Sequence, residues 1–140
     1  MAYDSIEPNM TVFLDISTTN IELAKLLVLR PISGITVVTN MLDVIQILST
    51  SQIHSIFIGG EFDYARNGFV GNMCDEFLQR FHFDLSFLGV VGIDLESGSV
   101  MTYMPNDGQT KRIVLNQSKK SIYVGGFGQN FIKLAIMNMP

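Results

Sequence analysis

The chain alternates short β-rich runs with segments of helical periodicity, and this alternation limits the folds open to it more than any other feature. Five apolar or β-branched runs are typical of strands, at residues 11–14, 35–38, 55–58, 85–91 and 121–124. Apolar residues recur near helical spacing between them, around residues 21–27, 42–48, 71–81 and 110–116. Strands that alternate with helices over short connections predict an α/β fold, with a mainly parallel sheet covered by helices on both faces.

Capping patterns and turn residues mark the expected ends of these elements. Thr19-x-x-Glu22 matches a capping box, so Thr19 is expected to cap the first helix. Thr39-Asn40 is expected to cap the second helix. Residues 61–68 are interpreted as a loop, and residues 98–108 as irregular, with turn signals at Pro105 and residues 106–108. The apolar face expected for the third helix consists of Cys74, Phe77, Leu78 and Phe81.

Length and composition favour a single domain over residues 1–140. The chain has 47% hydrophobic residues, enough for a core, but no apolar run near the ~18 residues of a membrane helix. It shows no secretory leader, and its one cysteine, Cys74, excludes an internal disulfide framework, so a cytoplasmic location is expected. The expected strands begin and end close to the termini, which suggests a domain cut from a longer protein.

Charge is distributed unevenly along the chain. The net charge of −4 disfavours nucleic-acid binding through the whole surface. Residues 1–107 hold all 13 acidic side chains and four basic ones, whereas residues 108–140 hold five basic side chains and no acid. The two parts can be ordinary faces of one fold. The basic residues can instead face an anionic ligand or an acidic part of the same or another subunit.

Four polar turns follow the expected strands, where ligands of open α/β sheets bind. They are residues 15–19, 39–40, 59–60 and 92–94. The hydroxyls of Ser17, Thr18 and Thr19 beside a helix N-terminus suit a phosphate, although such residues are also ordinary helix caps.

Single charged residues are less specific indicators of a binding site than these turns. Asp15 and Asp94 can accept hydrogen bonds from sugar hydroxyls or serve as turn residues, and Lys111 can pair with an anion or remain solvated. No metal site is expected, because His54 and His82 lie far from ligand spacing to Cys74, which is most simply a core residue. No motif for a nucleotide or another cofactor is present.

The turns, taken in order, resemble the C-terminal sensor domain of the DeoR family of bacterial transcriptional regulators. The similar segments cover about residues 3–136 and read VFLDISTTNIELAKLL, ITVVTNMLDVIQIL, IFIGGEFDYARNGFVG, FDLSFLGVVGIDLESG and TKR. The resemblance implies a fold similar to ribose-5-phosphate isomerase and the CoA transferases. It also implies a homo-oligomeric sensor of phosphorylated sugars rather than an enzyme, with DNA bound by an N-terminal winged helix-turn-helix absent from this chain.

The resemblance also implies a set of ligand-binding residues. Family members usually carry Asp-Ser-Gly-Thr-Thr at the positions of residues 15–19, where this chain has Ile16 and Ser17 in place of the Ser-Gly pair. The Asp-x-Ser-Lys-like turn of the family is replaced by Gly-Phe-Gly-Gln at residues 126–129. The implied ligand-binding residues are Asp15, Ser17, Thr18, Thr19, Thr39, Asn40, Gly59, Gly60, Asp94 and Lys111.

Three functions follow from these patterns. The first is a sensor that holds phosphate with Thr18, Thr19 and Lys111 and sugar hydroxyls with Asp15 and Asp94. The second is an oligomerisation domain with a vestigial pocket, suggested by the turn lost at residues 126–129 and by the many Met and Phe residues. The third is a sugar-phosphate isomerase with Asp94 as base, although residues 126–129 supply no second catalytic group.

Overall fold

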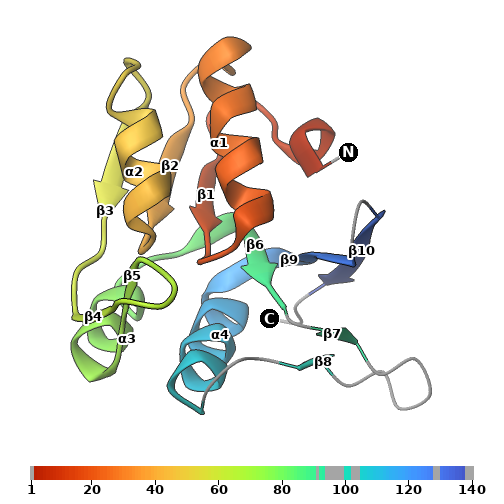
Figure 1. The fold of residues 1–140 in the computed structure, drawn as a ribbon. Coiled ribbons are helices and arrows are strands. Elements are labelled where there is room, and N and C mark those ends of the chain that lie inside the picture. Colours follow the sequence, from red (N-terminus) through yellow and green to blue (C-terminus); the bar gives the residue numbers. More distant parts are fainter. Residues whose placement is uncertain (1, 91, 94–99, 102–104, 128–129, 138–140) are drawn as a thin grey trace.

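The computed structural model describes residues 2–90, 92–93, 100–101, 105–127 and 130–137, with side-chain positions for residues 2–90 and 108–125. Figure 1 shows the described elements around one central sheet. No helix in this part of the chain is long and apolar enough to cross a membrane.

The central sheet has six strands in the order β10-β9-β6-β1-β2-β3. Five of them are parallel neighbours, which confirms the predicted α/β fold with a mainly parallel sheet. β10 pairs antiparallel with β9 at one edge, and β3 forms the other edge. The strands span β1 Thr11–Leu14, β2 Thr36–Thr39, β3 His54–Phe57, β6 Phe83–Gly89, β9 Ser118–Phe127 and β10 Asn130–Met137.

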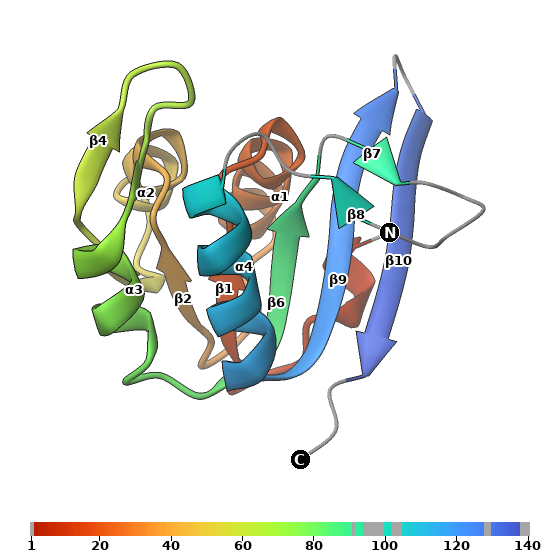
Figure 2. The ribbon, with the colours of Figure 1, turned by 90° about the horizontal axis from the view of Figure 1, so that it is seen from below.

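Helices cover both faces of the sheet. The short 3-10 helix η1 (Ala2–Ser5), α1 (Thr18–Leu29) and α2 (Leu42–Leu48) lie on one face, and α3 (Asn72–Leu78) and α4 (Pro105–Gln117) lie on the other (Figure 2). Side chains alternate across each strand, so that Val12 and Leu14 of β1 face one core cluster while Phe13 faces the second. Both faces of β1 are therefore buried, as expected for a strand between two layers of helices.

Several predicted boundaries were wrong. Ser17, not Thr19, caps α1, because the Ser17 backbone is extended (φ −167°) and its Oγ accepts the Thr19 N–H. Met41, not Thr39-Asn40, occupies the cap position of α2 and makes no side-chain cap bond. Phe77 is 52% exposed rather than part of the buried face of α3.

Three segments carry more regular structure than predicted. The predicted loop at residues 61–68 is instead most of a hairpin of β4 (Glu61–Asp63) and β5 (Gly68–Val70), whose turn is held by hydrogen bonds to Asp63. Part of residues 98–108 is regular too. β8 (Val100–Met101) pairs with β7 (Gly92–Ile93), and α4 begins at Pro105, since proline fits the first turn of a helix. β10 is a further strand beyond the last one predicted.

Candidate functional site

A buried ion pair lies at the carboxyl end of the central strand β1. Asp15 directly follows β1, and its Oδ2 accepts a hydrogen bond from the ammonium of Lys111 on α4. The Gly89 N–H, at the end of β6, donates to the same oxygen at 3.0 Å. Asp15 is fully buried and Lys111 is 4% exposed. Two residues that are 96 positions apart in the sequence, both predicted to bind ligand, are therefore brought into direct contact.

The pair fixes where the two charges point. A buried charge is stable only when it is paired and hydrogen-bonded, and this carboxylate receives both an ammonium and a backbone N–H. Asp15 thus holds the Lys111 ammonium beside the turn between β1 and α1, instead of presenting a carboxylate to solvent.

The turn from β1 into α1 presents hydroxyl groups at the helix N-terminus. Ser17 Oγ accepts the Thr19 N–H at 3.2 Å, and α1 then runs for 12 residues. Ser17 and Thr19 are half-buried, while Thr18 is exposed. A Cβ on Gly89 would lie 2.5 Å from the Ile16 carbonyl oxygen and 2.8 Å from Ser17 Cβ. The absence of a side chain at Gly89 therefore lets the turn lie against the end of β6.

Asn20 is a site residue that the sequence reasoning missed. Its amide donates to the carbonyl oxygens of Asp15 at 2.8 Å and Phe87 at 3.0 Å. Fully buried, it ties the first turn of α1 to the ends of β1 and β6. The available signal was a polar residue on the helical stripe that continues with Leu23, Ala24 and Leu27, all buried.

The side chains of Thr39 and Asn40 both donate hydrogen bonds to backbone carbonyl groups. Thr39 Oγ1 donates to the Leu14 carbonyl at 2.7 Å and accepts the Met41 N–H at 3.1 Å. The Asn40 amide donates to the Phe69 carbonyl, and the Phe69 N–H returns a bond to the Asn40 carbonyl, both at 2.8 Å. These buried side chains join the end of β2 to β1 and to the β4–β5 hairpin.

The remaining predicted site residues differ in their surroundings. A Cβ on Gly59 would meet nothing within 4 Å, so this backbone is open. A Cβ on Gly60 would lie 2.8 Å from the Val70 carbonyl oxygen and 3.0 Å from Cys74 Cβ, so Gly60 is required for close packing. Asp94 lies outside the described residues.

Further buried polar groups surround the site from α3 and α4. Thr110, next to Lys111, donates from Oγ1 to Asp75 Oδ1 at 2.6 Å. Burial raises the pKa of Asp75, and the Thr110 hydrogen bond partly opposes this shift. Burial raises the pKa of the Cys74 thiol to about 12, with additional repulsion from the Asp75 and Asp15 carboxylates. Cys74 is therefore a neutral core thiol rather than a nucleophile.

A hollow in the described part of the chain lies apart from this site. It has a volume of about 600 Å³ and opens near the amino ends of β2 and β3, and its lining includes Ile32, Thr36 and His54. His54 and Thr36 are hydrogen-bonded there at 3.3 Å. None of the predicted ligand-binding residues lines this hollow. Within the described part of the chain, no group of three or more His, Cys, Asp or Glu side chains is arranged to hold a metal ion.

Comparisons with known proteins point to one family. Residues 1–125 match the family model described as the DeoR C-terminal sensor domain. The chain is 32% identical over 124 residues to a putative aga operon transcriptional repressor of Escherichia coli, covering 88% of this chain and 45% of that protein. It is 31% identical over 140 residues to the glycerol-3-phosphate regulon repressor of Escherichia coli, covering 97% and 53%.

A third relative is the transcriptional repressor AccR of Agrobacterium fabrum, 31% identical over 115 residues, which cover 81% of this chain and 44% of the repressor. The chain thus spans about half the length of these relatives. The three proteins have a role in transcriptional repression in common.

The buried pair predicts that substitutions of Asp15 and Lys111 have strongly coupled effects on the free energy of unfolding. Replacing Lys111 by Met deprives the buried Asp15 carboxylate of this ammonium and should lower the free energy of unfolding by ~3–5 kcal/mol. Asp15→Asn should also destabilise the chain, and the double variant should lose much less than the sum of the two. Urea unfolding measures all three. Lys25→Met, in an exposed pair with Glu22, is the control and should change stability by less than ~1 kcal/mol. Additive losses would contradict the pairing.

Asp75 predicts a pH-dependent stability difference. Its folded-state pKa is raised, so the folded chain binds more protons than the unfolded chain between the two pKa values, and this contribution to stability is lost as pH rises. Asp75→Asn removes the titration and keeps an acceptor oxygen for Thr110. Urea unfolding at about pH 4 and pH 7 should show the variant gaining relative to wild type as pH increases. A difference that is independent of pH would show that burial does not shift this carboxyl.

Proposed function

The chain belongs to the family of DeoR C-terminal sensor domains, and on that premise we propose that it binds a phosphorylated sugar at the carboxyl ends of β1, β2 and β6. One observation carries the proposal. The buried Asp15–Lys111 pair lies directly beneath the hydroxyl-rich turn that opens α1.

The turn has the chemistry that a phosphate requires. The N-terminus of a helix offers free N–H groups and a partial positive charge, and α1 is long enough to supply both. Thr18 and Thr19 add hydroxyl donors, while Ser17 shapes the turn by capping the helix. In this proposal the Lys111 ammonium is shared between Asp15 and the phosphate, and the carboxylate keeps it pointed at the turn in the absence of ligand.

The sugar part of the ligand is assigned to the neighbouring strand ends. The open backbone at Gly59 leaves room for a substituent, whereas Thr39 and Asn40 act chiefly by holding the strand ends in place. Asp94 remains proposed as an acceptor for sugar hydroxyls. Relatives include the glycerol-3-phosphate regulon repressor and a lactose phosphotransferase system repressor of Lactococcus lactis, whose names refer to glycerol 3-phosphate and to a lactose phosphotransferase system.

The regulatory role is proposed from the same kinship. The relatives are transcriptional regulators about twice as long as this chain, and that supports a regulator rather than an isomerase. We propose that a winged helix-turn-helix module, N-terminal to the sensor domain, binds DNA, and that ligand changes its affinity by favouring one arrangement of the subunits.

A ligand panel tests the proposal. Glycerol 3-phosphate and ribose 5-phosphate are each compared with the parent polyol or sugar and with inorganic phosphate by thermal unfolding. A ligand at 100 times its Kd stabilises the fold by ~2.7 kcal/mol, which raises the Tm by several degrees. A rise with a phosphorylated compound and none with its parent is expected. No rise across a broad panel at millimolar concentration would favour a vestigial pocket.

The Thr19→Val variant tests the role of the α1 turn in ligand binding separately from its role in the stability of the fold. The variant keeps the shape of the side chain but removes the hydroxyl, and it should weaken binding of the phosphorylated ligand about fivefold to tenfold, the value of one neutral hydrogen bond. Thr11→Val, at the opposite end of β1, is the matched control and should leave affinity unchanged. Equal affinity for both variants would remove the α1 turn from the site.

A further inference from the structure

Ile16 is an apolar residue in the middle of the turn that opens α1. It lies between Asp15, which holds Lys111, and Ser17, which caps the helix. Its side chain is 8% exposed and belongs to the core cluster that also includes Leu23 of α1. A side chain without polar atoms cannot donate or accept a hydrogen bond, so any role of Ile16 in the site depends on the residues that it contacts.

The side chain of Ile16 packs directly on the β4–β5 hairpin. A Cβ on Gly68, the first residue of β5, would lie 2.5 Å from Ile16 Cδ1 and 2.7 Å from Ile16 Cγ1. The same Cβ would lie 3.0 Å from the Asn40 carbonyl oxygen. Contacts this short do not occur in close-packed interiors, so Ile16 can occupy its position only because residue 68 has no side chain. Ile16 and Gly68 therefore form a complementary packing pair.

The backbone of Ile16 packs on a second element, the end of β6. A Cβ on Gly89 would lie 2.5 Å from the Ile16 carbonyl oxygen. The N–H of the preceding residue, Asp15, donates to the Phe87 carbonyl at 3.1 Å. The turn is thus held against β6 through its backbone and against the hairpin through the side chain of Ile16.

The end of the hairpin that receives Ile16 is firmly placed. Asn67 has a left-handed backbone (φ 55°), a conformation that asparagine tolerates better than most residues. Its carbonyl accepts the Leu42 N–H at 2.9 Å, and its side-chain amide donates to Asp43 Oδ1 at 2.8 Å. These bonds fix the residue before Gly68 to the first turn of α2. Ile16 therefore packs against a surface whose position is already determined.

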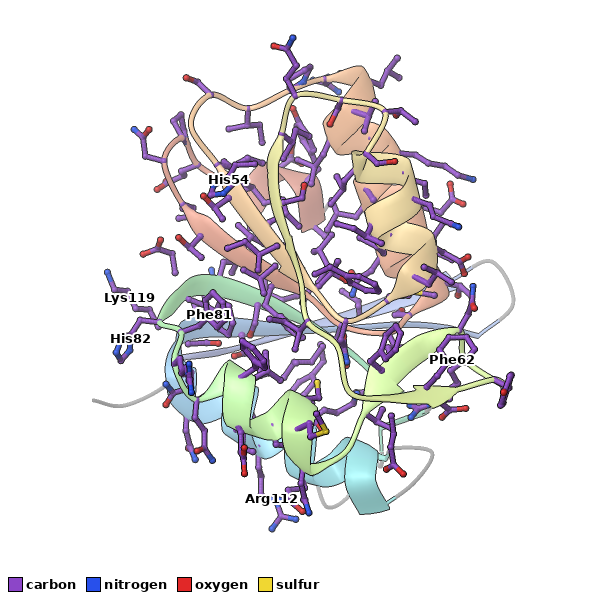
Figure 3. The ribbon with its side chains drawn as sticks, turned by 90° about the vertical axis from the view of Figure 1, so that its left-hand side faces the viewer. His54, Phe62, Phe81, His82, Arg112 and Lys119 are labelled. Atoms are coloured by element: carbon purple, nitrogen blue, oxygen red, sulfur yellow. The ribbon has the colours of Figure 1, made fainter. Side chains whose placement is uncertain are left out.

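The hairpin lies beside the carboxyl ends of the strands, where the ligand site is proposed. Figure 3 shows Phe62 of β4 across the molecule from His82 and Lys119, which lie at the amino ends of β6 and β9. Hydrogen bonds between Asn40 and Phe69 join β5 to the carboxyl end of β2. The packing of Ile16 on Gly68 connects this hairpin to the turn that follows β1.

We propose that Ile16 is a positioning residue of the ligand site, which holds the α1 turn in its phosphate-binding geometry by packing on Gly68. The inference rests on the ligand-binding function proposed above. Groups that bind a ligand must be kept within about 0.5 Å of their productive positions by the residues that support them. The Ile16 side chain gives this support without touching the ligand, because its contacts are to the hairpin.

Binding of ribose 5-phosphate and of glycerol 3-phosphate, measured by calorimetry at a temperature where each variant is folded, tests the proposal. Ile16→Ala removes the atoms that contact Gly68. If the turn then keeps its binding geometry about a tenth of the time, the apparent Kd rises about tenfold. Ile35→Ala is the matched control, since Ile35 is a 4% exposed isoleucine of the same core cluster, directly before β2. It should lower the Tm but leave the Kd unchanged.

A substitution on the hairpin tests the same contact from its other side. Gly68→Ala places a methyl group against Ile16 and should also raise the Kd, because the displaced side chain moves the turn. The double variant, Ile16→Ala with Gly68→Ala, should bind more tightly than Gly68→Ala alone, since the new methyl group enters the space that Ile16 leaves. Circular dichroism confirms that each variant is folded.

The results distinguish this inference from the proposed function. A wild-type chain that binds neither phosphorylated compound would contradict the proposed function, and the positioning role with it. If the wild type binds, equal Kd values for wild type and Ile16→Ala would overturn the positioning role alone. Equal losses of affinity in Ile16→Ala and Ile35→Ala, or a double variant no better than Gly68→Ala, would overturn it as well.

Discussion

Asp15 is the residue at which the main elements of this domain meet. Its side chain holds Lys111 of α4 and the Gly89 N–H of β6, its carbonyl accepts the Asn20 amide of α1, and its own N–H donates to the Phe87 carbonyl. Each contact lies in the buried interior, where an unpaired polar group is costly. The geometry of the β1–α1 turn therefore depends on elements from both faces of the sheet.

Side-chain hydrogen bonds connect the site to the neighbouring elements. Thr39 links β2 to β1, and Asn40 links the β4–β5 hairpin to β2. A ligand that changes the Asp15–Lys111 pair acts on α4, while one that moves the end of β2 acts on the hairpin.

Much of the fold could be predicted, because apolar runs and helical spacing report burial directly. The predicted boundaries were wrong where a single interaction decides them. Ser17 is an example, because its extended backbone makes it the cap of α1 in place of Thr19, which the Thr19-x-x-Glu22 pattern predicted. For the site, the sequence predicted Asp15 and Lys111 separately. It could not predict that they bind each other, since the contact joins residues 96 positions apart. Asn20 was missed because its partners are backbone carbonyls, which every residue carries.

The central claim is that an anionic ligand binds at the α1 turn above the Asp15–Lys111 pair. Backbone amide chemical shifts, followed by NMR during titration with ribose 5-phosphate and with inorganic phosphate, test it most directly. The account predicts that the largest changes occur at the amides of Thr18, Thr19 and Gly89, which surround the turn. Changes confined to the hollow lined by Ile32, Thr36 and His54 would contradict it.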